Sequence, residues 1–270
     1  MGEYTLSLPR DFSLKDTLSC GQCFRWEEDE NGSFAGAVQD GSVCHRAVLR
    51  QEEGTLFIES SADALFWARY LDLDEDYDRW KEAFAADPTL SAAIDYCGGI
   101  RLLRQDPWET LISFIISANN NIPRIKGIIG RLCENFGKDG AFPAAEDLCG
   151  LSAEDLAPIR AGFRAKYILD AARKVASGEL DLTAAAGMEI EDARQALMQV
   201  NGIGPKVAEC VLLYGFHRLE AFPVDTWIKK VLAQYYPDGF PGWAEPRGVA
   251  QQYLFHYIRN LPSATDNEHK

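Results

Sequence analysis

Short apolar stretches separated by clusters of Gly, Asn, Asp and Glu characterise the first 65 residues. Three of these stretches, residues 24–26, 33–38 and 55–59, have the length of β-strands. Short strands with turn residues between them are typical of hairpins and meanders. The pattern therefore predicts an antiparallel sheet in this part of the chain.

The spacing of apolar residues changes to three or four positions near Asp63, which indicates helices. Nearly every segment beyond residue 100 has this period and a short connection to the next. Asp106 and Pro107 are residue types preferred at the N-cap and first position of a helix. Residues 111–116 are apolar on most faces, so we expect a buried central helix there.

Two further helices are predicted in the second half of the chain. Ser152 and Asp155 have the spacing of a capping box, which is typical of a helix start. A helical pattern also runs through residues 185–200 and ends at Asn201 and Gly202.

Composition narrows the class of protein. The 270 residues are 47% hydrophobic and 25% charged, and no run approaches the roughly 18 apolar residues of a membrane helix. Collagen-like, disordered and membrane-spanning chains are therefore excluded. The first residues lack the basic and apolar parts of a signal peptide. We expect a cytoplasmic protein, associated with the nucleoid if the cell is prokaryotic.

The net charge of −14 argues at first against a nucleic-acid partner. The acidity is concentrated in residues 1–100, which hold 20 acidic and 8 basic residues, whereas residues 101–270 hold 21 and 19. Five basic residues and one acid lie between Pro158 and Lys174. Because a local basic cluster can bind a phosphate backbone, nucleic acid remains a candidate partner.

The seven cysteines are scattered and odd in number, which predicts free thiols in a reducing compartment. Cys20 and Cys23 form a CxxC pair. A zinc site would need a second such pair or paired histidines, and a redox pair would need a strand-to-helix setting. The sequence offers neither, so we expect no metal and keep redox chemistry as a remote alternative.

The segment from Val200 to Cys210 predicts a helix end, a Gly-Ile-Gly turn and a new helix. Gly202 and Gly204 permit backbone torsions that other residues avoid, and they leave N–H groups beside a helix start, where a phosphate can bind. Two alternatives remain open from the residues alone. The turn could connect two helices without binding anything, or it could be an incomplete dinucleotide fingerprint, since Val207 occupies the third glycine position.

Lys206 lies in the first turn of the new helix, where the helix dipole disfavours an ammonium. A desolvated lysine there can act as a nucleophile. Asp225, which is expected to cap the next helix, can face the same cleft and stabilise an oxocarbenium ion at a sugar C1′. The alternative is that Lys206 only contacts phosphate and Asp225 only caps its helix.

These segments together resemble the helix-hairpin-helix Gly/Pro-Asp DNA glycosylases, and more narrowly the 8-oxoguanine DNA glycosylase/AP lyase family. The resemblance extends from about Leu8 to Tyr257. It is carried by residues 19–26 (SCGQCFRW), 117–125 (SANNNIPRI), 162–167 (GFRAKY) and 200–230.

The family resemblance implies an α+β fold with two domains. An N-terminal antiparallel β-sheet domain is expected to pack on an all-helical helix-hairpin-helix glycosylase domain. The expected bounds are residues 1–97 and 98–262, followed by a tail at 263–270. No cysteine follows Cys210, so the four-cysteine iron–sulfur cluster of endonuclease III is not expected.

The resemblance also implies roles for individual residues. Lys206 is the Schiff-base nucleophile and Asp225 the catalytic carboxylate. The backbone carbonyl of Gly21 accepts N7–H of the lesion, a hydrogen that guanine lacks. Phe255 and Cys210 enclose the flipped base, Gln251 reads its Watson–Crick edge, and Pro223 lies nearby.

Further residues are implied to bind the DNA around the lesion. The gap and the unpaired cytosine are contacted by Asn119, Arg124, Phe163 and Arg164. The hairpin phosphate is contacted by Gly202, Ile203, Gly204 and Val207. The chain departs from the family where Phe163 replaces a frequent tyrosine and Trp227 a frequent histidine. Asn201 replaces a common proline, and Tyr214 is expected to reshape the base pocket.

The resemblance thus implies a monomeric enzyme that excises 8-oxoguanine opposite cytosine and nicks the strand by β-elimination. Its partner is double-stranded DNA containing an oxidised guanine, and neither a cofactor nor a membrane is expected. Two alternatives remain: a glycosylase for other damaged purines, and a non-catalytic helix-hairpin-helix DNA-binding protein.

Overall fold

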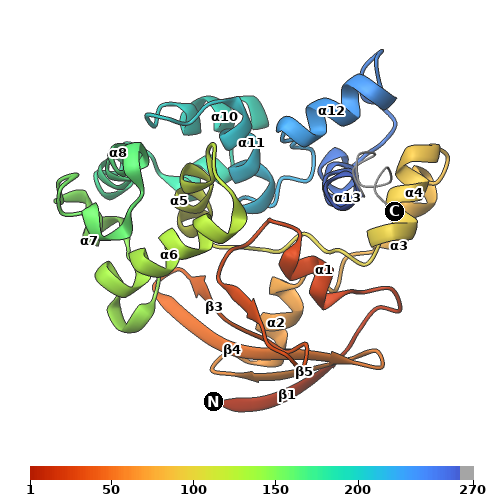
Figure 1. Ribbon diagram of the computed structural model, residues 1–270, viewed down its shortest axis with the longest axis horizontal. Helices are drawn as coiled ribbons and strands as arrows, with labels where there is room; N and C mark the ends of the chain where they lie inside the picture. Colours follow the sequence, from red (N-terminus) through yellow and green to blue (C-terminus); the bar gives the residue numbers. More distant parts are fainter. Residues whose placement is uncertain (262–270) are drawn as a thin grey trace, which may run out of the picture.

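The computed structural model describes residues 1–261, so the predicted tail and the last position of the predicted helical domain lie outside the described residues. A five-stranded antiparallel sheet lies at one end of the molecule, and helices form the rest (Figure 1). The sheet order is β1-β5-β4-β3-β2. The strands are β1 (Gly2–Ser7), β2 (Trp26–Glu28), β3 (Phe34–Asp40), β4 (Val43–Glu52) and β5 (Thr55–Ser60). The predicted α+β class and the antiparallel sheet are confirmed.

The sheet has its own apolar core. Alternate residues of β5 are buried, among them Leu56 and Ile58, because successive side chains of a strand point to opposite faces. Helix α2 (Ala64–Tyr70) contributes Trp67 and Tyr70, which pack against Trp26 of β2. A short helix that the apolar pattern did not predict, α1 (Leu14–Ser19), leads into the Cys20–Cys23 segment.

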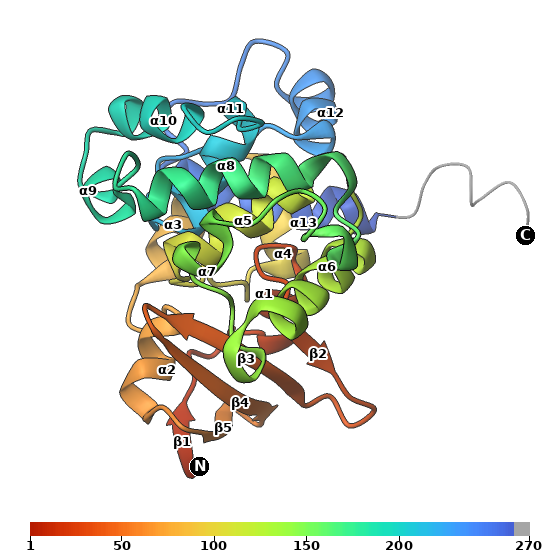
Figure 2. The ribbon, with the colours of Figure 1, turned by 90° about the vertical axis from the view of Figure 1, so that its left-hand side faces the viewer.

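Most of the helices lie to one side of the sheet, as Figure 2 shows, and their buried residues form a second and larger core. The predicted central helix is α5 (Pro107–Ser117); Asp106 caps it, and all its residues from Thr110 to Ile116 are buried. The other α-helices are α3 (Tyr77–Phe84), α4 (Pro88–Cys97), α6 (Ile122–Phe136), α7 (Ala145–Cys149), α8 (Ala165–Ala176), α9 (Leu182–Ala186), α10 (Ile190–Met198), α11 (Pro205–Tyr214), α12 (Thr226–Tyr235) and α13 (Arg247–Asn260). No helix in residues 1–261 has both the length and the apolar character needed to span a membrane.

Two of the predicted helices differ in the structure. Ser152 and Asp155 do exchange capping hydrogen bonds, but turns and a short 3-10 helix (Ala157–Ile159) follow instead of an α-helix. Pro158 cannot donate a backbone hydrogen bond, and Arg160 adopts a left-handed backbone with φ of 56°. The helix predicted over residues 185–200 is confirmed from Ile190 to Met198, but its start is wrong, because the chain turns at residues 187–189 between α9 and α10.

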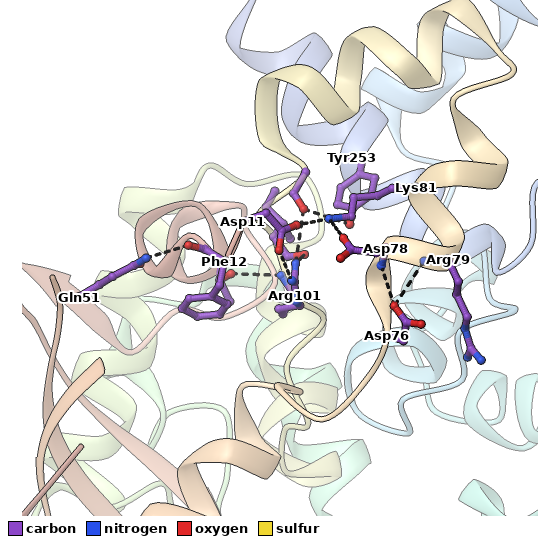
Figure 3. Close-up of polar contacts among 12 residues, drawn as sticks. Asp11, Phe12, Gln51, Asp76, Asp78, Arg79, Lys81, Arg101 and Tyr253 are labelled. Atoms are coloured by element: carbon purple, nitrogen blue, oxygen red, sulfur yellow. Dashed lines mark hydrogen bonds and ion pairs between the residues drawn. The ribbon is translucent and has the colours of Figure 1, made fainter. Parts of the chain in front are cut away.

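The two cores do not divide the chain at one position, and ion pairs connect them. Helices α3 and α4 precede residue 98 but pack in the helical core, where α4 lies against α13. Lys81 and Arg101 both bind the carboxylate of Asp11, as Figure 3 shows. These ion pairs of Asp11 with the buried Arg101 and with Lys81 of α3 therefore fix the segment that precedes α1 relative to α3.

Candidate active site and nucleic-acid interface

The turn between α10 and α11 is a tight hairpin. Gly202 has φ of 86°, and a Cβ atom there would lie 2.5 Å from the ring of Tyr167, so only glycine fits. Gly204 has φ of −97° and ψ of 179°, an extended conformation open to any residue, so the special torsion predicted for it is wrong. A Cβ atom on Gly204 would meet no atom within 4 Å. The helix start beside it is therefore open to a phosphate.

Lys206, Cys210 and Tyr214 are four residues apart and share one face of α11. Lys206 is half-buried in the first turn of the helix, as predicted. Its Nζ atom lies 5.4 Å from the ring centroid of Phe114, the α5 residue on which Tyr214 also stacks. The ring of Phe114 therefore contacts the Lys206 ammonium on one side.

Asp225 is the N-cap of α12, as predicted. Its Oδ1 atom accepts from the backbone N–H groups of Trp227 (3.0 Å) and Ile228 (2.8 Å). Within residues 1–261 its Oδ2 atom has no hydrogen-bond partner. One oxygen therefore fixes the carboxylate while the other remains available to a ligand.

Cys210 is close enough to both charged groups for each of them to act on its thiol. Burial raises the pKa of its thiol, and the Lys206 ammonium opposes this effect while the Asp225 carboxylate adds to it. Both charges therefore act on the same buried sulfur atom. The structure thus brings Lys206, Asp225 and Cys210 into one site.

Gly21 faces the site from the N-terminal part of the chain. Its φ is 89°, and a Cβ atom there would lie 3.6 Å from both the Phe255 ring and Ile122. The carbonyls on either side are occupied: Cys20 O accepts from Gln252, and Gln22 O accepts from Gln105. In the described part of the chain nothing donates to the carbonyl of Gly21 itself. It is a free acceptor between two fixed neighbours.

Gln251 and Pro223 meet on the other side of the site. Gln251 is 2% exposed, and its Nε2 atom donates to the carbonyl of Pro223 at 3.1 Å. Its Oε1 atom receives only a long contact of 3.5 Å from the hydroxyl of Tyr214. The Gln251 oxygen therefore keeps capacity to accept from a base edge.

The residues predicted to face the opposite strand are arranged differently. Asn119, with φ of 53°, and Arg124 are exposed, and Phe163 is 54% exposed. Arg164 is 2% exposed, and its Nε and Nη2 atoms donate to the carbonyls of Ala118 and Asn119. Its guanidinium is therefore committed to the loop that carries Asn119.

Two residues beside the site were not singled out from the sequence, Gln105 and Gln252. Gln252 is 1% exposed and follows Gln251 on α13. A pair of adjacent glutamines in a helix with a buried face is the only sequence signal that points to it. Trp227, which stands at a family histidine position, has the Nζ atom of Lys230 4.6 Å from its ring centroid.

The Cys20–Cys23 pair lacks the properties of a redox or metal site. Both cysteines are buried and free. Burial raises the pKa of Cys20 to about 12, which disfavours the thiolate that both kinds of chemistry need. Among residues 1–261, no group of three or more His, Cys, Asp and Glu side chains is arranged to hold a metal ion.

Two family models match the chain. The N-terminal domain of 8-oxoguanine DNA glycosylase matches residues 5–111, and the HhH-GPD superfamily of base excision DNA repair proteins matches residues 112–239. An N-glycosylase/DNA lyase of Saccharomyces cerevisiae is 36% identical, covering 84% of this chain and 69% of its own. A probable N-glycosylase/DNA lyase of Methanothermobacter thermautotrophicus is 31% identical, covering 92% and 94%.

Solved structures agree with these matches. MBOgg1 in complex with a low-affinity DNA ligand superposes with a TM-score of 0.87, at 41% identity and 95% coverage of both chains. The 8-oxoguanine glycosylase/lyase of Clostridium acetobutylicum superposes with a TM-score of 0.83, at 37% identity and 92% coverage of both. That structure contains double-stranded DNA with cytosine opposite 8-oxoguanine.

Proposed function

The chain belongs to the 8-oxoguanine DNA glycosylase family, and from this premise we propose that it removes 8-oxoguanine from double-stranded DNA and then cleaves the strand. It is a DNA glycosylase with AP lyase activity. The observation that carries the proposal is the meeting of Lys206 and Asp225 beside the free carbonyl of Gly21. An amine and a carboxylate at adjoining helix starts provide what chemistry at C1′ requires.

The lesion is recognised after it leaves the base stack. Gly21 accepts N7–H, which 8-oxoguanine has and guanine lacks, so guanine would present a lone pair to the carbonyl. Phe255 and Cys210 enclose the base, and Gln251, held by Pro223, reads its Watson–Crick edge. Extrusion costs a few kcal/mol, roughly, and exposes edges that the duplex hides.

Lys206 then attacks C1′ with the lone pair of its amine, and the bond from C1′ to the base breaks. Asp225 stabilises the positive charge that develops on the sugar, while the proton lost by the amine goes to the departing base. The C1′–O4′ bond then breaks as the second amine proton passes to O4′, which opens the sugar and gives a Schiff base. This Schiff base permits loss of a C2′ proton and of the 3′ phosphate. Water hydrolyses the imine and restores the lysine, so no cofactor enters the balance.

The remaining site residues bind the duplex around the gap. Gly202, Ile203, Gly204 and Val207 surround the helix start that receives a backbone phosphate. The N–H groups of Ile203 and Val207 already donate to the carbonyls of Val200 and Gly204. Phe163 inserts into the stack, and Asn119 and Arg124 contact the cytosine. Arg164 reaches that cytosine only by exchanging its bonds to the loop. One chain supplies every group in the site, which supports a monomeric enzyme; we place it in the cytoplasm, with the nucleoid if the cell is prokaryotic.

A second candidate is excision of other damaged purines. The DNA-3-methyladenine glycosylase of Bacillus subtilis is 31% identical, covering 72% of this chain and 69% of its own. The free carbonyl of Gly21 favours 8-oxoguanine, because 3-methyladenine has no hydrogen on N7 to donate.

End-labelled duplexes test the proposal. They carry 8-oxoguanine opposite each of the four bases, guanine opposite cytosine, 3-methyladenine opposite thymine, or an abasic site. Products are resolved with and without alkali, which separates excision from strand cleavage. We expect excision and cleavage with 8-oxoguanine opposite cytosine, and cleavage of the abasic duplex. Lys206→Gln should abolish cleavage while duplex binding remains. Preferential release of 3-methyladenine would establish the second candidate, and binding without either reaction would leave a non-catalytic DNA-binding protein.

A further inference from the structure

We propose that the buried Tyr214 and Gln252 and the half-buried Gln105 form a frame that fixes the carbonyl of Gly21, and that these three positioning residues set the selectivity for the lesion. The inference rests on the proposed function, since it assigns the control of the same pocket. None of the three needs to touch the base. They act on the backbone at both sides of the group that reads it.

The first half of the frame holds the residue before Gly21. The hydroxyl of Tyr214 donates to Oε1 of Gln252 at 2.6 Å, and Nε2 of Gln252 donates to the carbonyl of Cys20 at 3.4 Å. Tyr214 is 5% exposed and Gln252 is 1% exposed. Because both side chains are buried, these bonds leave the amide of Gln252 one orientation that satisfies both of its ends.

The second half holds the residue after Gly21. Nε2 of Gln105 donates to the carbonyl of Gln22 at 2.9 Å and approaches the backbone carbonyl of Tyr214 at 3.5 Å. The side chain of Gln22 is itself fixed, since it donates to the carbonyl of Arg101 and accepts from the N–H of Leu103. Tyr214 therefore contacts both halves, one through its hydroxyl and the other through its backbone.

The frame connects the Cys20–Gln22 segment to α11, the helix that carries Lys206. Tyr214 lies on the same face of α11 as Lys206, and its ring stacks on Phe114 at 5.2 Å with an interplanar angle of 14°. The left-handed backbone of Gly21 leaves its own peptide free to rotate unless its neighbours are held. Fixing both neighbours therefore holds the carbonyl of Gly21 in one orientation beside Phe255.

The test compares two reactions of one protein. Single-turnover excision of 8-oxoguanine opposite cytosine needs the Gly21 carbonyl, whereas cleavage of a preformed abasic site needs only Lys206. We expect Tyr214→Phe and Gln252→Met to slow excision about tenfold or more, with abasic-site cleavage changed by less than about twofold. In a Lys206→Gln background, both should reduce the ratio of affinities for 8-oxoguanine and guanine duplexes by a similar factor.

Two matched controls separate positioning from general loss of stability. Tyr253→Phe removes another buried tyrosine hydroxyl, this one on α13, and Gln51→Leu releases another loop held by a glutamine; both residues belong to the cluster of Figure 3. The controls should lower Tm as much as the frame variants without changing the ratio of excision to cleavage. Equal loss of both reactions in the frame variants, or unchanged excision, would overturn the frame. A wild-type protein inactive on both duplexes would overturn the proposed function and this inference with it.

Discussion

The two sides of the site are built in opposite ways. On the lesion side, Gly21 lies between two carbonyls that protein groups already hold, and Gln251 is buried and bonded to Pro223. On the side of the opposite strand, Arg124 and Phe163 are exposed. There the one buried arginine, Arg164, uses its donors on its own loop.

This difference suggests how the enzyme divides its selectivity. A side that is fixed before DNA binds loses little freedom on binding and penalises a wrong base strongly. A side whose contacts form only on the duplex must order its side chains and exchange existing bonds, so its selectivity is weaker. We therefore expect stringent recognition of the damaged base and a smaller preference for cytosine.

Substitution of Gly21 should have the largest effect, a loss of recognition of the damaged base. In Gly21→Ala the backbone must keep φ near 89°, a conformation that residues with a side chain rarely adopt, and the methyl group would lie 3.3 Å from Nη1 of Arg259. We expect excision of 8-oxoguanine to fall at least about 100-fold, and cleavage of an abasic duplex to change by less than about threefold, measured under single-turnover conditions. Loss of both reactions in a protein with unchanged Tm would contradict the role assigned to this carbonyl.

Substitutions of Arg124 and Arg164 test the side of the site that faces the opposite strand. Both Arg124→Ala and Arg164→Ala should reduce the preference for cytosine over the other three bases by about tenfold. Only Arg164→Ala should also lower Tm, because it removes hydrogen bonds that hold residues 118 and 119. Excision rates opposite each base, together with thermal melting, check both statements. If Arg124→Ala left the preference intact, recognition would not involve the exposed arginine.

Cys210 should have the smallest effect. Burial raises its pKa above the ordinary value of 9.0, despite the nearby ammonium of Lys206. The raised pKa favours the neutral thiol at the pH of the assay, so we expect its ionisation to add no limb to the pH profile. We expect Cys210→Ala to slow excision about threefold, through lost packing against the base, with an unchanged profile between pH 6 and 8.5. A limb present in the wild type and absent from the variant would show that the thiolate takes part.

Local patterns in the sequence predicted the elements on which the site is built. The cap at Asp106, the helix starts at Lys206 and Asp225, and the antiparallel sheet all depend on neighbouring residues, and the structure confirms them. Local signals were insufficient where a turn interrupts a continuous apolar period. This applies to residues 187–189 and to the segment after Ser152, where Pro158 ends the pattern.

The framing of Gly21 could not be predicted at all. Its partners Gln105 and Gln252 are 84 and 231 positions away along the chain, and glutamine is an ordinary surface residue in any local pattern. Only the packing of α13 and of the segment before α5 against residues 20–22 makes these amides hydrogen-bond partners of the carbonyls beside Gly21. The same holds for Arg164, whose sequence setting predicted a DNA contact but not its bonds to the loop.

The central claim is that one lysine attacks the sugar of the lesion that Gly21 reads. Its most direct test is to add borohydride during the reaction with a duplex containing 8-oxoguanine opposite cytosine. Borohydride reduces the Schiff base to a stable adduct, and peptide mass spectrometry then identifies the modified residue. The account predicts a single modified residue, Lys206, with 8-oxoguanine and abasic duplexes and none with undamaged guanine. An adduct on another residue, or excision of 8-oxoguanine without any adduct, would contradict it.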